Sequence, residues 1–114
     1  MKRVYEIIAA LVVTILFICL LFSILKDRAM EQTILRLLYY PTGDAIDEYY
    51  GERRQHMGEK VISVRQVPDT PYYEVIIQVR TFVGPHNPPY GLETMTFYVT
   101  YGQVGLKEFE HQDG

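Results

Sequence analysis

The sequence predicts an α+β fold in which one N-terminal transmembrane helix precedes two short helices packed on a four-stranded antiparallel β-meander. Three observations lead to this prediction. An uncharged apolar run covers residues 7–25, apolar residues recur at helical spacing between residues 29 and 50, and apolar and polar residues alternate from residue 61 onward. We therefore divide the chain into an N-terminal membrane anchor, residues 1–28, and a small extracytoplasmic α+β domain, residues 29–114.

The anchor is the apolar run that begins at Ile7 and ends at Leu25, and none of its 19 residues is charged. As an α-helix this run is roughly 28 Å long, close to the hydrocarbon thickness of a bilayer. A cleaved signal peptide is the alternative, but its apolar core usually has roughly 7–15 residues and ends in a small-x-small site. The small residues nearest the end of the run, Ser23 and Ala29, do not form such a site. We therefore expect the segment to remain in the membrane.

Charged residues on both sides of the anchor bear on its orientation. Lys2 and Arg3 favour a cytoplasmic N-terminus, whereas Lys26 and Arg28 compete from the other end. A short N-terminal tail followed by a C-terminal domain favours export of that domain. We expect a single-pass protein of the cell membrane with its C-terminal domain outside the cytoplasm, and a cytoplasmic domain is the alternative.

Two short helices are predicted between the anchor and the sheet. The first lies within residues 29–40, and the second is expected to begin at an Asp44 cap and to stop at Gly51. Residues 51–59 are expected to form a polar loop. Ile34, Leu37 and Leu38 recur at helical spacing in the first helix, and the inward stripe of the second is Ile46, Tyr49 and Tyr50. Adjacent helix positions point about 100° apart, so we expect one tyrosine of each helical pair in the core and the other at its rim.

Four strands are predicted from the alternation of apolar and polar residues. They cover residues 61–67, 73–80, 94–101 and 104–109. A sheet with one buried face is covered here by the only apolar elements available, the two short helices. The residues of the second and third strands that are expected to face one side are Tyr73, Val75, Ile77 and Val79, and Met95, Phe97, Val99 and Tyr101.

The connection between the second and third strands contains three prolines in eight residues, from Gly84 to Gly91. We call this segment, residues 84–91, the proline loop. Proline fixes φ and restricts the residue before it, so the loop loses little entropy when it binds a partner. It therefore presents His86, Asn87 and Tyr90 at low cost, and its Pro88–Pro89 bond could be cis. The alternative is a stiff hairpin connection whose side chains only cap its own backbone.

Three stretches of the domain resemble an uncharacterised family. They are residues 45–51 (AIDEYYG), 78–82 (QVRTF) and 84–94 (GPHNPPYGLET), and together they cover most of residues 41–101. On these motifs the chain resembles small exported or membrane-anchored proteins of endospore-forming Gram-positive bacteria. The resemblance implies a shared fold and an extracytoplasmic setting, and it implies no activity.

Composition argues against several classes of function. Residues 29–114 carry 7 Lys and Arg against 12 Asp and Glu, a net charge of −5, which would repel a nucleic acid backbone. The only cysteine, Cys19, lies in the apolar run, so the domain forms no internal disulfide. His56, His86 and His111 lack the spacing of metal ligands, and we expect neither a metal nor another cofactor.

Catalytic patterns are also weak, so we expect no enzyme activity. Ser63 is the only serine outside the anchor, and it lacks the flanking glycines of a nucleophile elbow. The neighbouring pairs Asp47 with Glu48 and Glu108 with Glu110 are typical of solvated charges on a helix surface and at a strand end. Acid–base catalysis would instead need two carboxyl groups that converge on one cleft.

These features favour a membrane-tethered, non-catalytic binding module of the cell envelope. The membrane itself is one partner, through the anchor. We expect an envelope protein or a cell-wall component to contact the proline loop through His86, Asn87 and Tyr90, with Arg80 beside them.

The alternative function places the activity in the anchor. In that case the transmembrane helix regulates or scaffolds another membrane protein, and the domain stabilises it or acts as a sensor. Ala10 and Thr14 have the four-residue spacing of small residues that lets two membrane helices approach closely.

Overall fold

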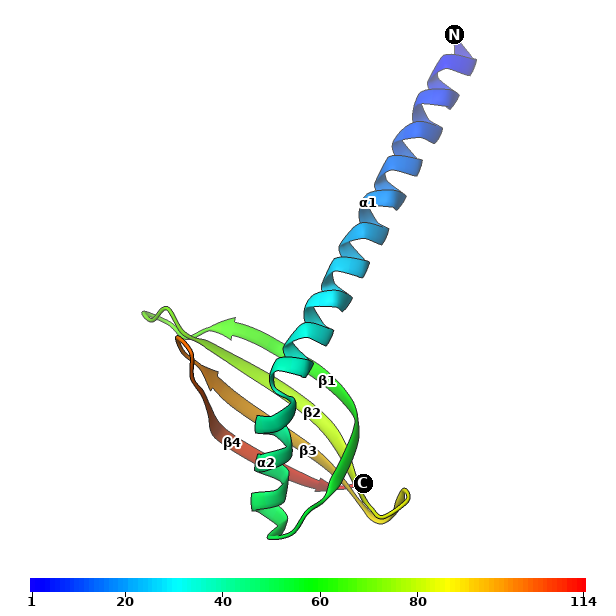
Figure 1. Cartoon of the computed structure of the whole chain (residues 1–114). Coiled ribbons are helices and arrows are strands. Elements are labelled where there is room, and N and C mark those ends of the chain that lie inside the picture. The colour runs from blue at the N-terminus through cyan, green and yellow to red at the C-terminus, as the bar shows by residue number, and fades with distance from the viewer. The chain divides into compact units, whose positions relative to one another are not determined.

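The computed structural model describes all 114 residues and contains two helices and one four-stranded sheet (Figure 1). The predicted α+β class is therefore confirmed. The chain divides into two compact units, Met1–Gln32 and Thr33–Gly114. In chain order the elements are α1 (Lys2–Leu37), α2 (Tyr39–Tyr50), β1 (Gln55–Gln66), β2 (Tyr73–Val83), β3 (Asn87–Val99) and β4 (Val104–Asp113).

α1 is a single helix from Lys2 to Leu37, and it is long and apolar enough to cross a membrane. The first short helix, expected within residues 29–40, is therefore the C-terminal part of α1 and not a separate element. The sequence between the apolar run and Leu37 contains neither glycine nor proline and consists largely of good helix formers. Because nothing in this stretch stops the helix, it continues past the charged residues that follow the run.

α2 begins at Tyr39, before the cap that was expected at Asp44. Pro41 does not prevent this early start because it lies in the first turn, where the backbone N–H groups of a helix have no intrahelical partner. Gly51 ends the helix as predicted, in the left-handed conformation with a φ of 70°.

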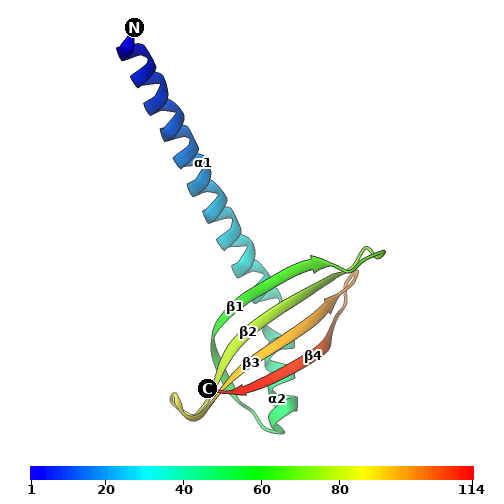
Figure 2. The same ribbon diagram turned by 180° about the vertical axis from the view of Figure 1, so that it is seen from behind.

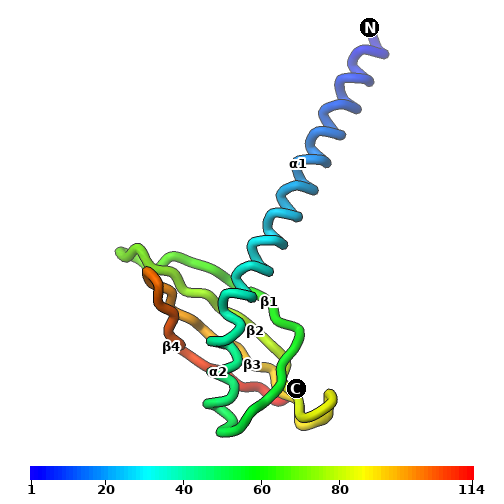
Figure 3. Tube along the Cα trace, in the orientation of Figure 1, coloured from blue at the N-terminus to red at the C-terminus, as the bar shows by residue number.

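The sheet is an antiparallel meander with the strand order β1-β2-β3-β4 (Figure 3). Its strands are longer than the alternation predicts. β1 begins at Gln55, inside the expected polar loop, and β3 begins at Asn87, inside the proline loop. Backbone pairing extends both strands without alternating side chains: Gln55, His56 and Met57 of β1 pair with β2, as do Asn87 and the residues from Gly91 onward in β3. Only residues 84–86 remain as the turn between β2 and β3.

One face of the sheet packs against α2 (Figure 1), and the opposite face, seen in Figure 2, carries no helix of this unit. Ile46 of α2 is fully buried against the sheet, as predicted. Tyr73 and Tyr101, which were expected on the buried face, are 45% and 80% exposed, because Tyr73 is the first residue of β2 and Tyr101 lies in the turn after β3. The buried core consists of Leu38, Ala45, Ile46, Val75, Ile77, Val79, Met95 and Phe97.

Adjacent apolar residues in the helices divide between the core and the surface. Leu38, which lies between α1 and α2, is buried, whereas Leu37, the last residue of α1, is exposed. Tyr50 packs against the core, while Tyr49 is half exposed and stacks on Phe109 of β4, with ring centroids 4.6 Å apart. Neighbouring helix positions point about 100° apart, so only one of Tyr49 and Tyr50 can face the sheet, as expected.

Candidate functional site

The turn between β2 and β3 is held by contacts among its own residues. His86 has a φ of 62°, and its ring stacks on Phe82 with the ring centroids 4.4 Å apart. The hydroxyl of Tyr90 donates a hydrogen bond to the carbonyl oxygen of His86 at 2.7 Å. The Pro88–Pro89 bond is cis. The proline loop is therefore largely strand and turn, with two of its predicted binding residues in contact with each other.

A cavity of about 470 Å³ lies beside this turn, and we call it the turn cavity. Three of the four predicted binding residues, Arg80, His86 and Tyr90, line it. Asn87, the fourth, does not; it is exposed and pairs with Val83 at the start of β3. The residues that line the cavity are Met57, Arg80, Thr81, Phe82, His86, Tyr90, Gly91, Leu92, Gln112, Asp113 and Gly114.

Part of this lining is one row of partners that crosses the whole sheet. Met57 of β1 pairs with Arg80 of β2, Arg80 pairs with Leu92 of β3, and Leu92 pairs with Gln112 of β4. Side chains directly opposite one another share a face. Because Val79 is buried under α2, the alternation of β2 puts Arg80 on the face without a helix. The row therefore belongs to the open face.

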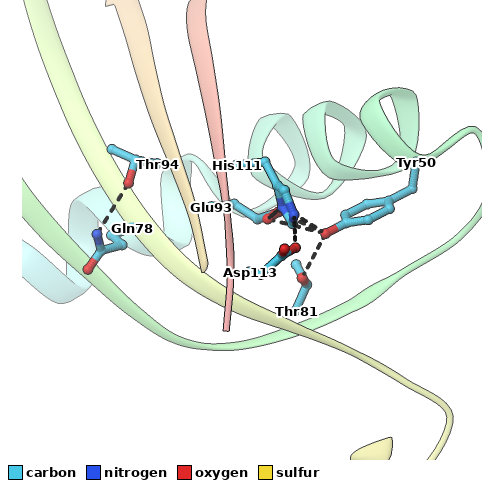
Figure 4. Close-up of polar contacts among 7 residues, drawn as sticks. All are labelled: Tyr50, Gln78, Thr81, Glu93, Thr94, His111 and Asp113. Atoms are coloured by element: carbon cyan, nitrogen blue, oxygen red, sulfur yellow. Dashed lines mark hydrogen bonds and ion pairs between the residues drawn. The ribbon is translucent and has the colours of Figure 1, made fainter. Parts of the chain in front are cut away.

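A polar network around one buried carboxylate lies on the covered face (Figure 4), and two of its residues, Thr81 and Asp113, also line the turn cavity. Its centre is Glu93, whose side chain is fully buried. The hydroxyl of Tyr50 donates to the two carboxylate oxygens of Glu93 at 3.2 and 3.1 Å and lies 3.3 Å from the hydroxyl of Thr81. His111 contacts the same carboxylate through Nδ1 and binds Asp113 through Nε2 at 3.0 Å.

The electrostatics of the network favour a charged His111. The carboxylate of Glu93, and after it that of Asp113, raises the pKa of His111 above its ordinary value of 6.5. Both ring nitrogens face carboxylates, so the doubly protonated ring donates a hydrogen bond to each of them. Burial is the main cause that raises the pKa of Tyr50, which keeps its hydroxyl protonated as a donor. In this state His111 has no free nitrogen that could accept a proton from a substrate.

Gly91 allows the network to close. A Cβ atom at this position would lie 2.5 Å from Oγ1 of Thr81, and 2.7 Å from both Oε1 of Glu93 and the hydroxyl oxygen of Tyr50. These distances are shorter than a carbon atom tolerates, so any side chain at residue 91 would push the oxygens apart. Gly91 also lines the turn cavity, so it belongs to both the cavity wall and the polar network.

The sequence reasoning missed the buried Glu93 and its partner His111 as parts of one cluster. A signal was present, because Glu93 lies two residues before Met95, and His111 lies two residues after Phe109. A period of two therefore places them on the same face as the apolar residues. The predicted third strand began at residue 94, one residue after Glu93, and the predicted fourth strand ended at residue 109, two residues before His111.

A second buried carboxylate, Glu74, lies on the open face. Two cations hold it: the guanidinium of Arg65 at 2.9 Å and the ammonium of Lys107. Lys107 first and Arg65 second lower the pKa of Glu74 below its ordinary value of 4.5. Both cations extend into solvent, so the arrangement covers a buried charge and leaves no free group for chemistry.

A second cavity, of about 730 Å³, lies beside α2 and the start of β1. Arg54 lines it, stacks over the ring of Tyr50 at 3.9 Å and binds Glu52 at 3.0 Å. Nε of Arg54 is buried and makes no hydrogen bond. His56 also lines this cavity and binds Glu59 at 2.7 Å.

The remaining candidates from the sequence lie apart from one another. No three His, Cys, Asp or Glu side chains gather in an arrangement that could hold a metal ion. Of the neighbouring carboxylates, Asp47 accepts a hydrogen bond from the backbone amide of Arg54 at 3.0 Å. Glu108 and Glu110 are exposed on β4. The turn cavity and the adjoining network are therefore the best-defined candidate site.

Comparison with known proteins gives a family and no function. No curated protein and no solved structure matches the chain. Residues 30–113 match the family described as protein of unknown function (DUF3888). This match covers α2, the whole sheet, the turn cavity and the polar network. The chain therefore belongs to the DUF3888 family of proteins of unknown function.

Proposed function

We propose that this protein is a membrane-tethered, non-catalytic binding module whose ligand surface is the turn cavity. The observation that carries the proposal is that Arg80, His86 and Tyr90, from β2, the turn and β3, line one cavity. A volume of about 470 Å³ lies within the range of roughly 300–1,000 Å³ that is common for ligand sites. The partner is an envelope protein or a cell-wall component.

The proposed setting is the outer surface of the cell membrane. α1 supplies an anchor of sufficient length and apolar character. The resemblance of residues 84–94 to exported proteins of endospore-forming Gram-positive bacteria supports an extracytoplasmic position for the folded unit. A tether raises the effective concentration of the module near partners in the same membrane, so modest affinity at the turn cavity is sufficient.

Binding is favoured over catalysis by the state of the groups beside the cavity. The hydroxyl of Tyr90 is engaged by the carbonyl of His86, and the ring of His86 is stacked on Phe82. Behind the cavity, His111 is held between two carboxylates. A preorganised wall of this kind lowers the entropy cost of binding, and it offers no free base next to a nucleophile.

The sharpest test uses a photo-crosslinking amino acid at one of two positions on the same strand. Met57 lines the turn cavity and is 48% exposed, whereas Ile62 is equally exposed, at 49%, but does not line it. We expect the crosslinker at Met57 to trap a discrete partner in native membranes. The matched crosslinker at Ile62 should trap it at most weakly.

The outcome that contradicts the proposal is equally definite. If both positions trap the same products in the same yield, or if neither traps a partner, the turn cavity is not the binding surface. A further control is Tyr90→Phe, which removes only the hydroxyl group that donates to His86. Loss of crosslinking in this variant would indicate that the shape of the turn contributes to recognition.

The alternative function, in which the anchor binds another membrane helix, has weaker support. The hydroxyl of Thr14 donates to the carbonyl of Ala10 at 2.8 Å, so it already has a partner within its own helix. Replacing residues 1–28 with an unrelated anchor separates the two functions. Retained partner binding would rule out the anchor-based function. Loss of partner binding with an intact folded unit would favour it.

A further inference from the structure

We infer that the turn cavity takes an apolar monocarboxylate, with the guanidinium of Arg80 as the partner of the ligand's carboxylate group. This inference rests on the proposed function and adds the chemical class of the group that the envelope protein or cell-wall component presents to the cavity. Its basis is the position of one unpaired cation among apolar neighbours on the open face of the sheet.

Arg80 differs from the other cations that lie beside buried groups. Arg65 and Lys107 bind Glu74, and Arg54 binds Glu52. Arg80 is exposed and forms no ion pair. Arginine presents a planar set of N–H donors that matches the two oxygens of a carboxylate, so an acid in the cavity can form a bidentate pair with it.

The neighbours of Arg80 define the rest of the ligand. Its partners across the sheet are Met57 on one side and Leu92 on the other, and the ring of Phe82 also lines the cavity. An anion with an apolar body buries that body against these side chains while its charged group meets Arg80. A small, strongly hydrated anion would gain only the charge contact.

The other charges near the cavity favour a single negative charge on the ligand. The chain has a net charge of −3, and Asp113 also lines the cavity. The carboxylate of Asp113 is bound to Nε2 of His111 at 3.0 Å, so its charge is partly compensated. One ligand carboxylate can therefore pair with Arg80, whereas a multiply charged anion would be repelled by the rest of the surface.

The test uses the full chain in lipid nanodiscs with ¹³C-methyl methionine as the reporter. Met57 lines the cavity, Met95 is buried in the core, and Met30 lies in α1. We expect 3-phenylpropionate to shift the Met57 signal saturably without shifting Met95 or Met30. The neutral isostere 3-phenylpropanamide should bind at least about tenfold more weakly, because it lacks the charge-assisted pair.

Matched substitutions assign the effect to one residue. Arg80→Gln should lower the affinity for 3-phenylpropionate to that for the amide, whereas Arg53→Gln removes the same charge outside this cavity and should have no effect. Raising the salt concentration should weaken binding of the acid and not of the amide. Equal affinities for acid and amide, or an unchanged affinity in Arg80→Gln, would overturn the inference.

The two proposals fail separately. If the crosslinker at Met57 traps a partner but the Met57 signal does not distinguish acid from amide, the ligand class is wrong and the binding surface stands. If neither experiment gives a signal at Met57, the turn cavity binds nothing and both proposals fall.

Discussion

The sheet holds two buried carboxylates, one on each face, and their partners differ. Glu74 lies at the start of β2 on the open face, and Glu93 lies in β3 on the face that α2 covers. The exposed fractions of the two residues are 3% and 0%. Burial of a charge is costly unless partners replace water, so each carboxylate requires its own set of donors.

The difference between the partners determines how the stability of each end of the sheet responds to pH. Glu74 is bound by the cations Arg65 and Lys107. Glu93 is bound by a neutral hydroxyl, that of Tyr50, and by His111, which loses its charge when the pH rises through its raised pKa. The end of the sheet beside the turn cavity therefore loses stability as the pH rises, and it also depends on α2.

The largest loss of stability is expected for Glu93→Ala. It removes the centre of the network and leaves His111 and the hydroxyl of Tyr50 without their acceptor. We expect the free energy of unfolding to fall by about 3 kcal/mol, measured by denaturant titration. Glu110→Ala, an exposed carboxylate on β4, is the control and should change stability little. Equal losses of unfolding free energy in the two variants would contradict a stabilising role of the network.

Gly91→Ala tests whether the network needs its close packing. The added methyl group would meet oxygen atoms of Thr81, Glu93 and Tyr50 at 2.5–2.7 Å, so we expect a loss of about 2 kcal/mol. Gly105→Ala is the matched control in β4, because a Cβ there meets nothing within 4 Å. If the two substitutions have the same effect on thermal unfolding, the crowding at residue 91 is not significant.

Tyr50→Phe measures the contribution of α2 to the same end of the sheet. The ring remains, but Glu93 loses the hydroxyl donor that contacts both of its oxygens. A hydrogen bond to a charged group is worth about 1.5 kcal/mol or more, and we expect a loss near that value in denaturant titrations. Tyr49→Phe, on the exposed neighbour, should leave stability unchanged.

The pH dependence of stability should have opposite signs at the two ends. The raised pKa of His111 means that its contribution is complete below pH 6.5 and is lost as the pH rises through the folded-state value. The lowered pKa of Glu74 means that its contribution is present above pH 4.5 and is lost as the pH falls through the folded-state value.

Melting temperatures of two variants across a pH range check this contrast. The difference in melting temperature between the natural chain and His111→Gln should decrease toward alkaline pH. The difference in melting temperature between the natural chain and Glu74→Gln should decrease toward acidic pH. We expect the smallest effects here, because both groups partly face solvent or solvent-exposed partners. Gaps that narrow in the same direction would contradict the assignment of the charges.

Much of the fold was predictable because it rests on periodic burial. The apolar run of α1, the strand order and the core positions Ile46, Ile77 and Met95 all follow from period and hydrophobicity. The ends of the elements were not predictable in this way. The start of α2 depends on tolerance of Pro41 in a first turn, and the first residues of β1 and β3 are paired by backbone bonds.

The candidate site was predictable only in part. The density of prolines indicated the region, and Arg80, His86 and Tyr90 line one cavity there, but Asn87 does not. The network around Glu93 could not be read from local sequence because its members come from α2, β2, β3 and β4. Such a cluster becomes visible only when the strand register is known.

The most direct test of the account is the topology of the membrane-bound chain. In a Cys19→Ala background, a cysteine replaces Tyr101, which is 80% exposed at the turn after β3, or Glu6, at the start of α1. In intact protoplasts, a membrane-impermeant maleimide should label the Tyr101→Cys protein and not the Glu6→Cys protein, and the labelled chain should keep residues 1–28. Labelling of Tyr101→Cys only after lysis, or recovery of a freely diffusing chain without the apolar run, would contradict the account.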